Sequence, residues 1–219
     1  MSEEENHEKP EGQVSHFVEL TTSPWFAYAK VRRFHVLNPV HQITDGEHTA
    51  RIQGMIHFLR HWFPKELFLE TVKNELYYAS LHDVDEVVVG DIPGYIKPRL
   101  KNIDEVAREL LTDPEWYGLD PDKPQDTVDD ILKAKEKTVL LEVLDPLDAL
   151  IFLHDEWFTT HDHAVYLNIK DFAGSWYDDL TDKVSCEMPE IAQFLRKLRD
   201  EIIQKVDDAV KVLALPCDL

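Results

Sequence analysis

The sequence is poor in the residues that build disulfide scaffolds and phosphate-binding loops. Its 219 residues include two cysteines, Cys186 and Cys217, and seven glycines. Small extracellular scaffolds need several paired cysteines, so two isolated thiols favour a reduced intracellular protein. The glycine-rich signatures of P-loop and dinucleotide-binding proteins are missing, as are the G-x-S-x-G motif of hydrolases and the H-E-x-x-H motif of zinc proteases. These enzyme classes therefore lose their main support.

Long apolar runs and an excess of positive charge are missing as well. No stretch approaches the roughly 20 apolar residues of a membrane span, and the start, MSEEEN, lacks the regions of a signal peptide. We therefore expect a soluble, cytoplasmic protein that does not bind membranes. The net charge of −20 repels polyanions, so we expect no nucleic-acid polymer as a partner. A small phosphorylated substrate is compatible with this charge if a metal ion and a few placed cations offset it.

Length and composition predict a single domain with short appended segments. The chain is 43% hydrophobic, which is enough to bury one core of respectable size. Residues 1–14 are acidic and polar, so we expect a disordered tail there. Residues 15–158 are expected to form the core. Residues 159–219 are expected to form a C-terminal loop and a long helix, from Met188 to Leu215, that packs on the core or forms an oligomer interface.

Apolar residues recur at helical spacing through most of the chain, which predicts an all-α fold of about eight helices. We expect one or two helices between Val14 and Phe34, followed by a turn at Asn38-Pro39. A capping-box pattern opens a predicted helix at Asn102. Residues 112–125 are predicted as a loop, and residues 126–137 as a short packing helix.

Asp45-Gly46-Glu47-His48 is predicted as a turn that runs into a helix. His48 shares the inner face of this helix with three apolar residues at helical spacing, Ile52, Met55 and Leu59. A lone histidine on an apolar face is more often a satisfied core residue than a metal ligand. His57 and His61 have the spacing of a zinc-binding pair, but they fall on the outer face. Solvated side chains are the simpler interpretation of that pair.

The next predicted helix ends at Leu81, and its apolar face carries His82 and Asp83 to its inner C-terminal end. A neutral imidazole beside a carboxylate makes half of a divalent-metal site. Glu86 follows three residues after Asp83 and adds a group that can carry a proton. The rest of the chain must supply the missing ligands.

The most apolar stretch runs from about Thr138 to Phe158 and contains two aspartates on one helical face. Burying carboxylates costs several kcal/mol unless a cation pairs with them, and a metal ion would do so. A second interpretation stays open for Asp145, because two helices could meet there. Asp145 would then be an N-cap, with Pro146 and Asp148 in the first turn of the second helix.

His154, His161 and His163 lie in and before a segment that is predicted as a polar loop. A second metal site is conceivable there, since three histidines occur close together. They show no periodicity, however, which favours ordinary surface residues.

The order of these motifs resembles a known family. The matching segments are Arg33-Phe34, Asp45-Gly46-Glu47-His48, Leu81-His82-Asp83-Val84-Asp85-Glu86-Val87, Gly90-Asp91-Ile92-Pro93 and Asp145. With this set the chain resembles the HD-domain metal-dependent phosphohydrolases. Within them it is similar to the bacterial 5'-deoxynucleotidases of the YfbR type and their phage relatives. The resemblance covers residues 15–158 and includes the order of the elements.

The resemblance implies a fold, a set of metal ligands and a proton carrier. The fold would be a single-domain HD helical bundle. One divalent ion, cobalt, manganese, zinc or iron, would be bound by His48, His82, Asp83 and Asp145. Two imidazoles and two carboxylates suit these ions better than they suit a soft metal. Glu86 would act as general acid or base, with Asp83 as the second catalytic residue.

The resemblance also implies contacts with the substrate. Arg33 would bind the phosphate with two N–H groups. Asp91 would contact the substrate, for example at the sugar 3'-hydroxyl. Phe34, where the family carries tryptophan, would pack against the deoxyribose. Lys97 lies in a loop whose cations either face a phosphate or are solvated, together with Arg99 and Lys101.

The function implied is hydrolysis of deoxyribonucleoside 5'-monophosphates to deoxynucleoside and phosphate. The alternative is a phage-type dNTP triphosphohydrolase, acting on dATP for example, which releases triphosphate at the same site. That substrate would bring a further magnesium ion, and the cations around Arg32 and Lys97 would favour it. A non-catalytic nucleotide-binding HD module and a cyclic-nucleotide or (p)ppGpp hydrolase are weaker alternatives. We expect a homo-oligomer, either a dimer or a hexamer.

Overall fold

The computed structural model describes residues 31–33, 39–83, 86, 90 and 138–213. Several predictions lie outside these residues: the tail over 1–14, the helices expected at Asn102 and over 126–137, and the loop over 112–125. Three predicted substrate contacts also lie outside the described residues, namely Phe34, Asp91 and Lys97.

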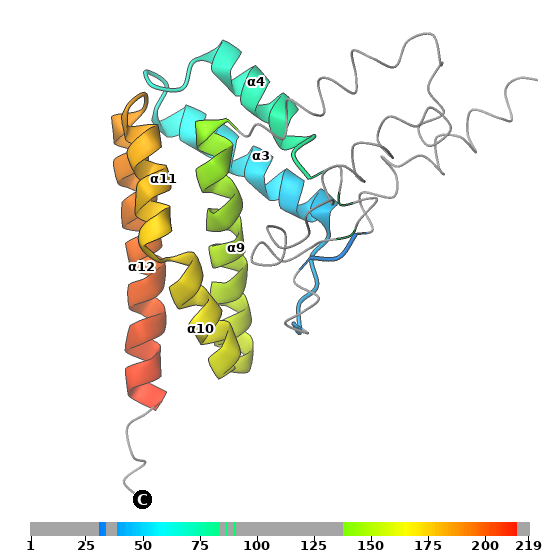
Figure 1. Cartoon of the computed structure of the whole chain (residues 1–219), viewed down its shortest axis with the longest axis vertical. Coiled ribbons are helices and arrows are strands. Elements are labelled where there is room, and N and C mark those ends of the chain that lie inside the picture. Colours follow the sequence, from blue (N-terminus) through cyan, green and yellow to red (C-terminus); the bar gives the residue numbers. More distant parts are fainter. Residues whose placement is uncertain (1–30, 34–38, 84–85, 87–89, 91–137, 214–219) are drawn as a thin grey trace, which may run out of the picture.

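The described part of the chain is all-α, as predicted. The pairing between Arg32 and Thr44 is an isolated bridge rather than a sheet. No helix in the described part combines the length and the apolar character that are needed to cross a bilayer. The six helices seen in Figure 1 are α3 (Asp45–Trp62), α4 (Leu69–Ala79), α9 (Val139–Thr160), α10 (His163–Phe172), α11 (Ser175–Ser185) and α12 (Pro189–Leu213).

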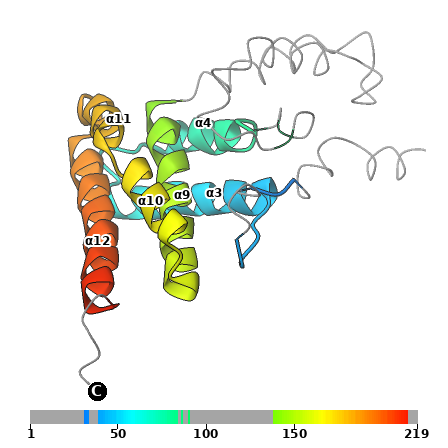
Figure 2. The same ribbon diagram turned by 60° about the horizontal axis from the view of Figure 1, so that its bottom comes forward.

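Helix α9 is the central element, and it contacts α3, α4, α10, α11 and α12. Figures 1 and 2 show α12 alongside α9, while α3 crosses α9 at an angle. A helix that is apolar on almost every side is expected in the interior. The sequence of α9 has this character, and its buried core residues include Leu140, Leu141, Val143, Leu144, Leu147, Leu150, Leu153 and Trp157.

Helix α9 is continuous through Pro146, so the interpretation of Asp145 as an N-cap between two helices is wrong. The N-cap is Thr138, whose hydroxyl oxygen accepts a hydrogen bond from Leu141 N at 3.3 Å. Proline lacks the N–H that would bond to the carbonyl of Glu142, which costs about 3 kcal/mol in a helix interior. The helix persists because its packed apolar residues stabilise it on both sides of the proline.

Helix α3 begins at Asp45, inside the predicted turn. Thr44 and Glu47 form a capping box. The hydroxyl of Thr44 accepts from Glu47 N at 3.2 Å, and the carboxylate of Glu47 accepts from Thr44 N at 2.8 Å. This cap fixes the first turn of α3, which carries His48 on its buried side.

Residues 31–33 are not helical, and Arg32 forms an isolated bridge with Thr44, which corrects the prediction for the end of the segment 14–34. Arg33 N donates to Ile43 O at 3.0 Å, and Asp45 N donates to Val31 O at 3.0 Å. The N–H of Arg33 and the carbonyl of Val31 are thus satisfied by Ile43 and Asp45 instead of by a helical turn. This pairing places Arg33 beside the N-terminus of α3.

Glu156, near the end of α9, binds the chain that leads into α3. Its carboxylate accepts hydrogen bonds from Val40 N at 2.5 Å and from His41 N at 3.1 Å. The ring Nδ1 of His41 lies 3.1 Å from the same carboxylate. Glu156 is itself buried, so the segment before α3 is fixed to the interior of the fold.

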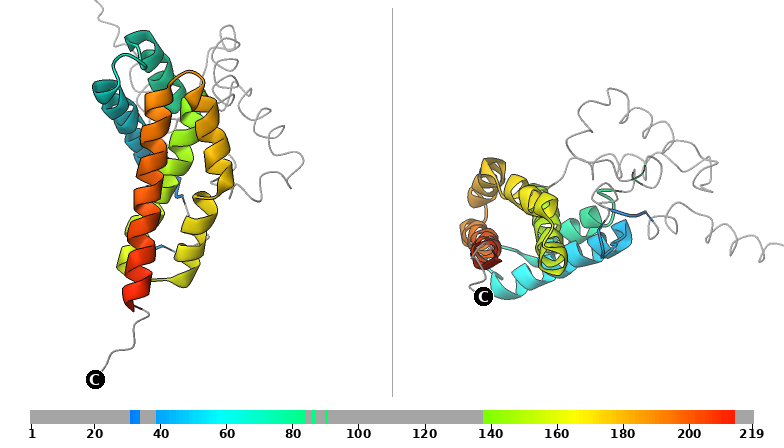
Figure 3. Two further views of the ribbon diagram at one scale, coloured as in Figure 1. Left: turned by 90° about the vertical axis from the view of Figure 1, so that its left-hand side faces the viewer. Right: turned by 90° about the horizontal axis from the view of Figure 1, so that it is seen from below.

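Two helices, α10 and α11, occupy the segment that was predicted as a loop from residue 159 to the long helix (Figure 3). Asp162 caps α10 by accepting from Ala164 N at 2.7 Å. The buried residues do recur at helical spacing, but each run is short and interrupted by polar side chains. They are Val165 and Ile169 in α10, and Tyr177, Thr181 and Val184 in α11.

Helix α12 packs its apolar face inside the chain, against α9 and α11. It starts and ends close to the predicted bounds. The carboxylate of Glu66, from the loop before α4, accepts from Glu190 N at 2.8 Å and Ile191 N at 2.9 Å. This side chain satisfies backbone donors at the start of α12. The buried apolar residues of α12 are Ile191, Ala192, Leu195, Ile202 and Val206.

Candidate metal centre

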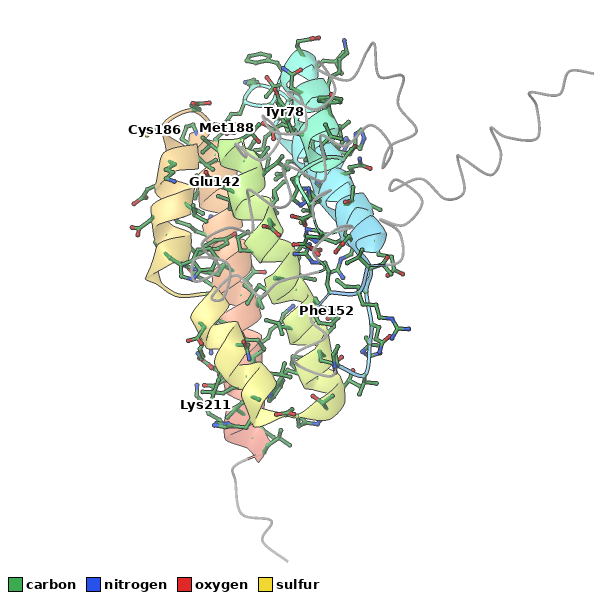
Figure 4. All side chains as sticks on the ribbon, turned by 45° about the vertical axis from the view of Figure 1, so that its right-hand side comes forward. Tyr78, Glu142, Phe152, Cys186, Met188 and Lys211 are labelled. Atoms are coloured by element: carbon green, nitrogen blue, oxygen red, sulfur yellow. The ribbon has the colours of Figure 1, made fainter. Side chains whose placement is uncertain are left out.

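Three separate segments bring the four predicted metal ligands together. His48 lies in the first turn of α3, His82 and Asp83 follow the end of α4, and Asp145 lies in the second turn of α9. Each offers one ligand atom, and these atoms all lie within 4.8 Å of one another. The two imidazoles and Asp83 are buried, whereas the side chain of Asp145 is 20% exposed. In Figure 4, side chains fill the space between α3 and α9.

Each histidine is held through its Nδ1 atom. His48 Nδ1 lies 2.8 Å from a carboxylate oxygen of Asp148, and His82 Nδ1 lies 2.8 Å from the backbone carbonyl of Ala79. Because both partners are acceptors, Nδ1 of each neutral ring carries the proton. The Nε2 atom of each ring then presents a lone pair. These two Nε2 atoms face each other at 3.2 Å.

Two carboxylates complete the cluster. His82 Nε2 lies 3.1 Å from Asp83 Oδ2, and His48 Nε2 lies 3.5 Å from the same oxygen. His48 Nε2 is also 3.4 Å from Asp145 Oδ1. Lone pairs and negative charge therefore converge on one point, an arrangement that a bound cation would stabilise. The donor set fits a divalent ion such as manganese, cobalt, zinc or iron.

Arg33 reaches the cluster from the segment before α3. Its Nη1 atom forms a hydrogen-bonded ion pair with Asp83, and Nη2 lies 3.5 Å from Asp145 Oδ1. The same Nη1 atom is 3.7 Å from Asp45 and 3.7 Å from Glu86. The sequence predicted Arg33 as a phosphate contact. The structure brings its guanidinium to the edge of the proposed ion site, where a bound phosphate would need positive charge.

Glu86 and Asp45 flank this guanidinium. Glu86 is buried, and its backbone N donates to Asp83 O at 2.9 Å, which keeps the predicted proton carrier beside the ligand pair. Asp45 is completely buried at the first position of α3, where the helix N-terminus favours a negative charge. The sequence analysis did not identify Asp45 as a site residue. The sequence signal that could have drawn attention to Asp45 is its position directly after Thr44, the residue that caps α3.

Asp148 is the second site residue whose role the sequence did not reveal. It was recognised as a buried carboxylate, and its side chain is 1% exposed. One oxygen lies 2.8 Å from His48 Nδ1 and the other lies 2.7 Å from Arg51 Nε. Burial lowers the pKa of His48, but the neighbouring carboxylates of Asp145 and Asp148 favour the protonated ring and outweigh burial, so the pKa is raised above its ordinary value.

The other histidines considered from the sequence do not join this cluster. His57 and His61 are exposed on the outer face of α3, as predicted. His154 pairs with the neighbouring Asp155 at 2.9 Å, and His161 ends α9 in a left-handed conformation. Within the described residues, the His48–His82–Asp83–Asp145 group is the one set of ligand atoms that converges, so no second site is formed there.

Comparison with known proteins gives no independent guide to function. No protein-family model matches the chain, and no match was found among curated proteins. The structural findings that bear on function are the helical fold of the described residues and the buried histidine and aspartate cluster.

Proposed function

We propose that this protein is a metal-dependent phosphohydrolase of the HD type that acts on deoxyribonucleoside 5'-phosphates. The observation that carries the proposal is the convergence of two Nε2 lone pairs and two carboxylates at one point. Their order along the chain, histidine, then histidine-aspartate, then aspartate, agrees with the resemblance to HD-domain phosphohydrolases. One divalent ion held there would supply Lewis-acid stabilisation of a phosphoryl group and activate water near neutral pH.

The residues around the ligands have roles that suit phosphate hydrolysis. Arg33 would bind the phosphate oxygens, because a guanidinium can donate two parallel hydrogen bonds to them. Asp83 pairs with Arg33 and would also hold the ion, so that a phosphate contacting the guanidinium would lie close to the ion. Glu86 would donate or accept the proton at the scissile oxygen. Phe34, Asp91 and Lys97 remain proposed substrate contacts.

The described cations near the cluster favour a substrate of low charge. Arg33 lies among four carboxylates, and Arg51 is paired with Asp148 on the far side of His48. A monophosphate needs less compensation than a triphosphate. The alternative dNTP triphosphohydrolase would need a further cation, such as a magnesium ion bound with the substrate or the predicted contact of Lys97.

Metal analysis and a substrate panel test the proposal. The protein, loaded with manganese or cobalt, is offered deoxynucleoside mono- and triphosphates and their ribose counterparts, and phosphate, pyrophosphate and tripolyphosphate are measured. We expect phosphate release from deoxynucleoside monophosphates. Tripolyphosphate release instead would support the alternative, and release of neither product by a metal-loaded protein would favour a nucleotide-binding module.

Variants assign the activity to the cluster. His82→Ala and Asp83→Ala should bind the ion weakly and lose turnover while keeping their helical circular dichroism. Glu86→Gln should keep the ion but lower kcat by about 10²–10⁴-fold, the usual contribution of a general acid or base. His61→Ala, which removes an exposed imidazole from the outer face of α3, is the control and should stay active. Full activity of His82→Ala or Asp83→Ala would contradict the proposal.

A further inference from the structure

We infer that Asp148 is a positioning residue that sets the affinity of the metal centre through His48, and that Arg51 holds Asp148 in place. The inference rests on the proposed metal site. It concerns two residues that would touch neither the ion nor a substrate.

The carboxylate of Asp148 lies between two residues of α3 that are one helical turn apart. Its Oδ2 atom accepts from His48 Nδ1 at 2.8 Å, and its Oδ1 atom lies 2.7 Å from Arg51 Nε. One oxygen is therefore hydrogen-bonded to the ring, and the other forms an ion pair without the geometry of a hydrogen bond. The Asp148 side chain is 1% exposed, whereas that of Arg51 is 33% exposed. The contacts thus lead from the outer side of α3 through Asp148 to the ring of His48.

The two imidazoles of the cluster differ in the group that accepts the hydrogen bond from Nδ1. His82 donates its Nδ1 proton to the neutral carbonyl of Ala79, while His48 donates to a carboxylate. A carboxylate behind an imidazole fixes the ring and its tautomer, and it makes the opposite nitrogen a stronger donor to a metal. We therefore expect His48 to contribute more to ion affinity than its geometry alone suggests.

Helix α9 contributes to the centre twice within one turn. Asp145 faces the cluster directly, and Asp148, three residues later, supports the ligand that comes from α3. A buried carboxylate is stable only when it is paired, and Arg51 supplies the positive charge on the side away from the ring. The same contacts would align α3 with α9 and orient His48.

The competing explanation is that Asp148 only joins α3 to α9. A variant of Arg51 separates the two explanations. Arg51 links α3 to α9 through Asp148 Oδ1, but it does not contact Oδ2, the oxygen that faces His48. Loss of the ion pair should lower stability in either case. Only a positioning role makes ion affinity depend on Asp148 more than on Arg51.

The test measures manganese affinity by calorimetry and cobalt binding by visible absorption at one fixed pH. Asp148→Ala should bind manganese about 10–100-fold more weakly, which is the usual effect of losing such a partner. Asp148→Asn should lose less, because its amide oxygen can still accept from Nδ1. Arg51→Met should lose stability with a much smaller change in affinity. Glu142→Gln, on the same helix as Asp148, breaks an ion pair with Lys183 of α11 and is the matched control.

The cobalt spectrum should also change in Asp148→Ala, since the ring of His48 loses its orientation, and it should be restored towards the native spectrum in Asp148→Asn. Native affinity and spectrum in both Asp148 variants, with unfolding free energies lowered as in Arg51→Met, would show that Asp148 is only structural. If Asp148→Ala does not fold, Asp148→Leu takes its place, because leucine has a similar size and cannot accept the proton of His48 Nδ1, and native affinity in Asp148→Leu overturns the inference. A wild-type protein that binds no ion would instead refute the proposed function.

Discussion

At the scale of single residues, buried acids in the described part of the chain differ in what they contact. Asp148 meets two side-chain nitrogens, and Glu156 meets two backbone N–H groups. Glu75, on the inner side of α4, accepts a hydrogen bond from the hydroxyl of Thr138. Burial raises the pKa of Glu75 from an ordinary 4.5 to about 7, the hydroxyl opposes this shift, and the charge of Glu187 adds to it.

This pKa makes stability depend on pH in a definite direction. Between pH 4.5 and about 7 the folded state holds a proton on Glu75 that the unfolded chain has released. The stability that protonated Glu75 contributes to the folded state is therefore complete below pH 4.5, and it is lost as the pH rises through about 7. Glu75→Gln cannot ionise, so it should be more stable than the native protein by up to roughly 3 kcal/mol above neutral pH. Urea unfolding at several pH values measures the difference.

Glu142, a partly buried acid in α9, provides the control. Glu142→Gln loses an ion pair with Lys183 at 3.0 Å, so it should gain no stability at high pH. The advantage of Glu75→Gln should disappear near pH 4.5, where both folded and unfolded chains begin to hold the proton. An advantage that stayed constant across the pH range would show that Glu75 does not titrate in this way.

Residue types and spacing singled out His48, His82 and Asp83, whereas Asp145 joined them as a predicted ligand through the family resemblance, because its own segment also allowed an N-cap. His48 was assigned to an inner helical face, and His82 and Asp83 to the end of a helix, from local periodicity alone. The role of Asp148 was not predictable, because its partner His48 is 100 residues away and no local pattern pairs them. Asp45 was overlooked for a similar reason, since its contact with Arg33 depends on the pairing of residues 31–33 with the chain before α3.

At the scale of elements, long and regular apolar patterns predicted helices well. The patterns of α3, α4 and α12 gave elements close to those observed. Local signals failed where packing decides the outcome. Pro146 indicated a helix boundary, yet α9 passes through it because its neighbours are buried on both sides. The helices α10 and α11 were missed because each buries few residues in a segment rich in polar side chains.

Replacing two of the described glycines by alanine should change the stability of the protein in opposite directions. Gly54 lies exposed in α3, where a methyl group would have no neighbour within 4 Å, so Gly54→Ala should stabilise the protein by about 0.5–1 kcal/mol. Gly90 has a φ of 76°, a conformation that other residues adopt with difficulty. Gly90→Ala should therefore destabilise the protein by about 1–2 kcal/mol. Chemical unfolding of both variants checks the prediction, and effects of the same sign would contradict it.

At the scale of the whole molecule, the candidate ligands join parts of the fold that are distant in sequence. The sequence predicted the all-α class, because helical periodicity runs through most of the chain. It did not predict that α9 would contact all the other described helices, since helix pairing depends on the three-dimensional fit of side chains. The expected dimer or hexamer stays a prediction, although the apolar face of α12 is used within the chain.

Because α3, the end of α4 and α9 each supply a ligand, ion binding should stabilise the molecule as a unit. Manganese at about 100 times its Kd should raise the unfolding free energy by about 2.7 kcal/mol if the unfolded chain does not bind it. Thermal unfolding with and without the ion measures this gain. His82→Ala should lose the gain, and His61→Ala should retain it. Equal stabilisation of both variants would place the ion elsewhere.

The attachment of the segment before α3 has a consequence for ligand entry. Residues 31–33 pair with the chain at 43–45, and Glu156 binds the backbone at Val40 and His41. The backbone that carries Arg33 is therefore already ordered before any anion arrives, so little conformational entropy is lost on contact. If Arg33 binds phosphate as proposed, weakening the attachment through Glu156→Gln should slow that step, even though Glu156 lies near the opposite end of α9 from the candidate ligand Asp145.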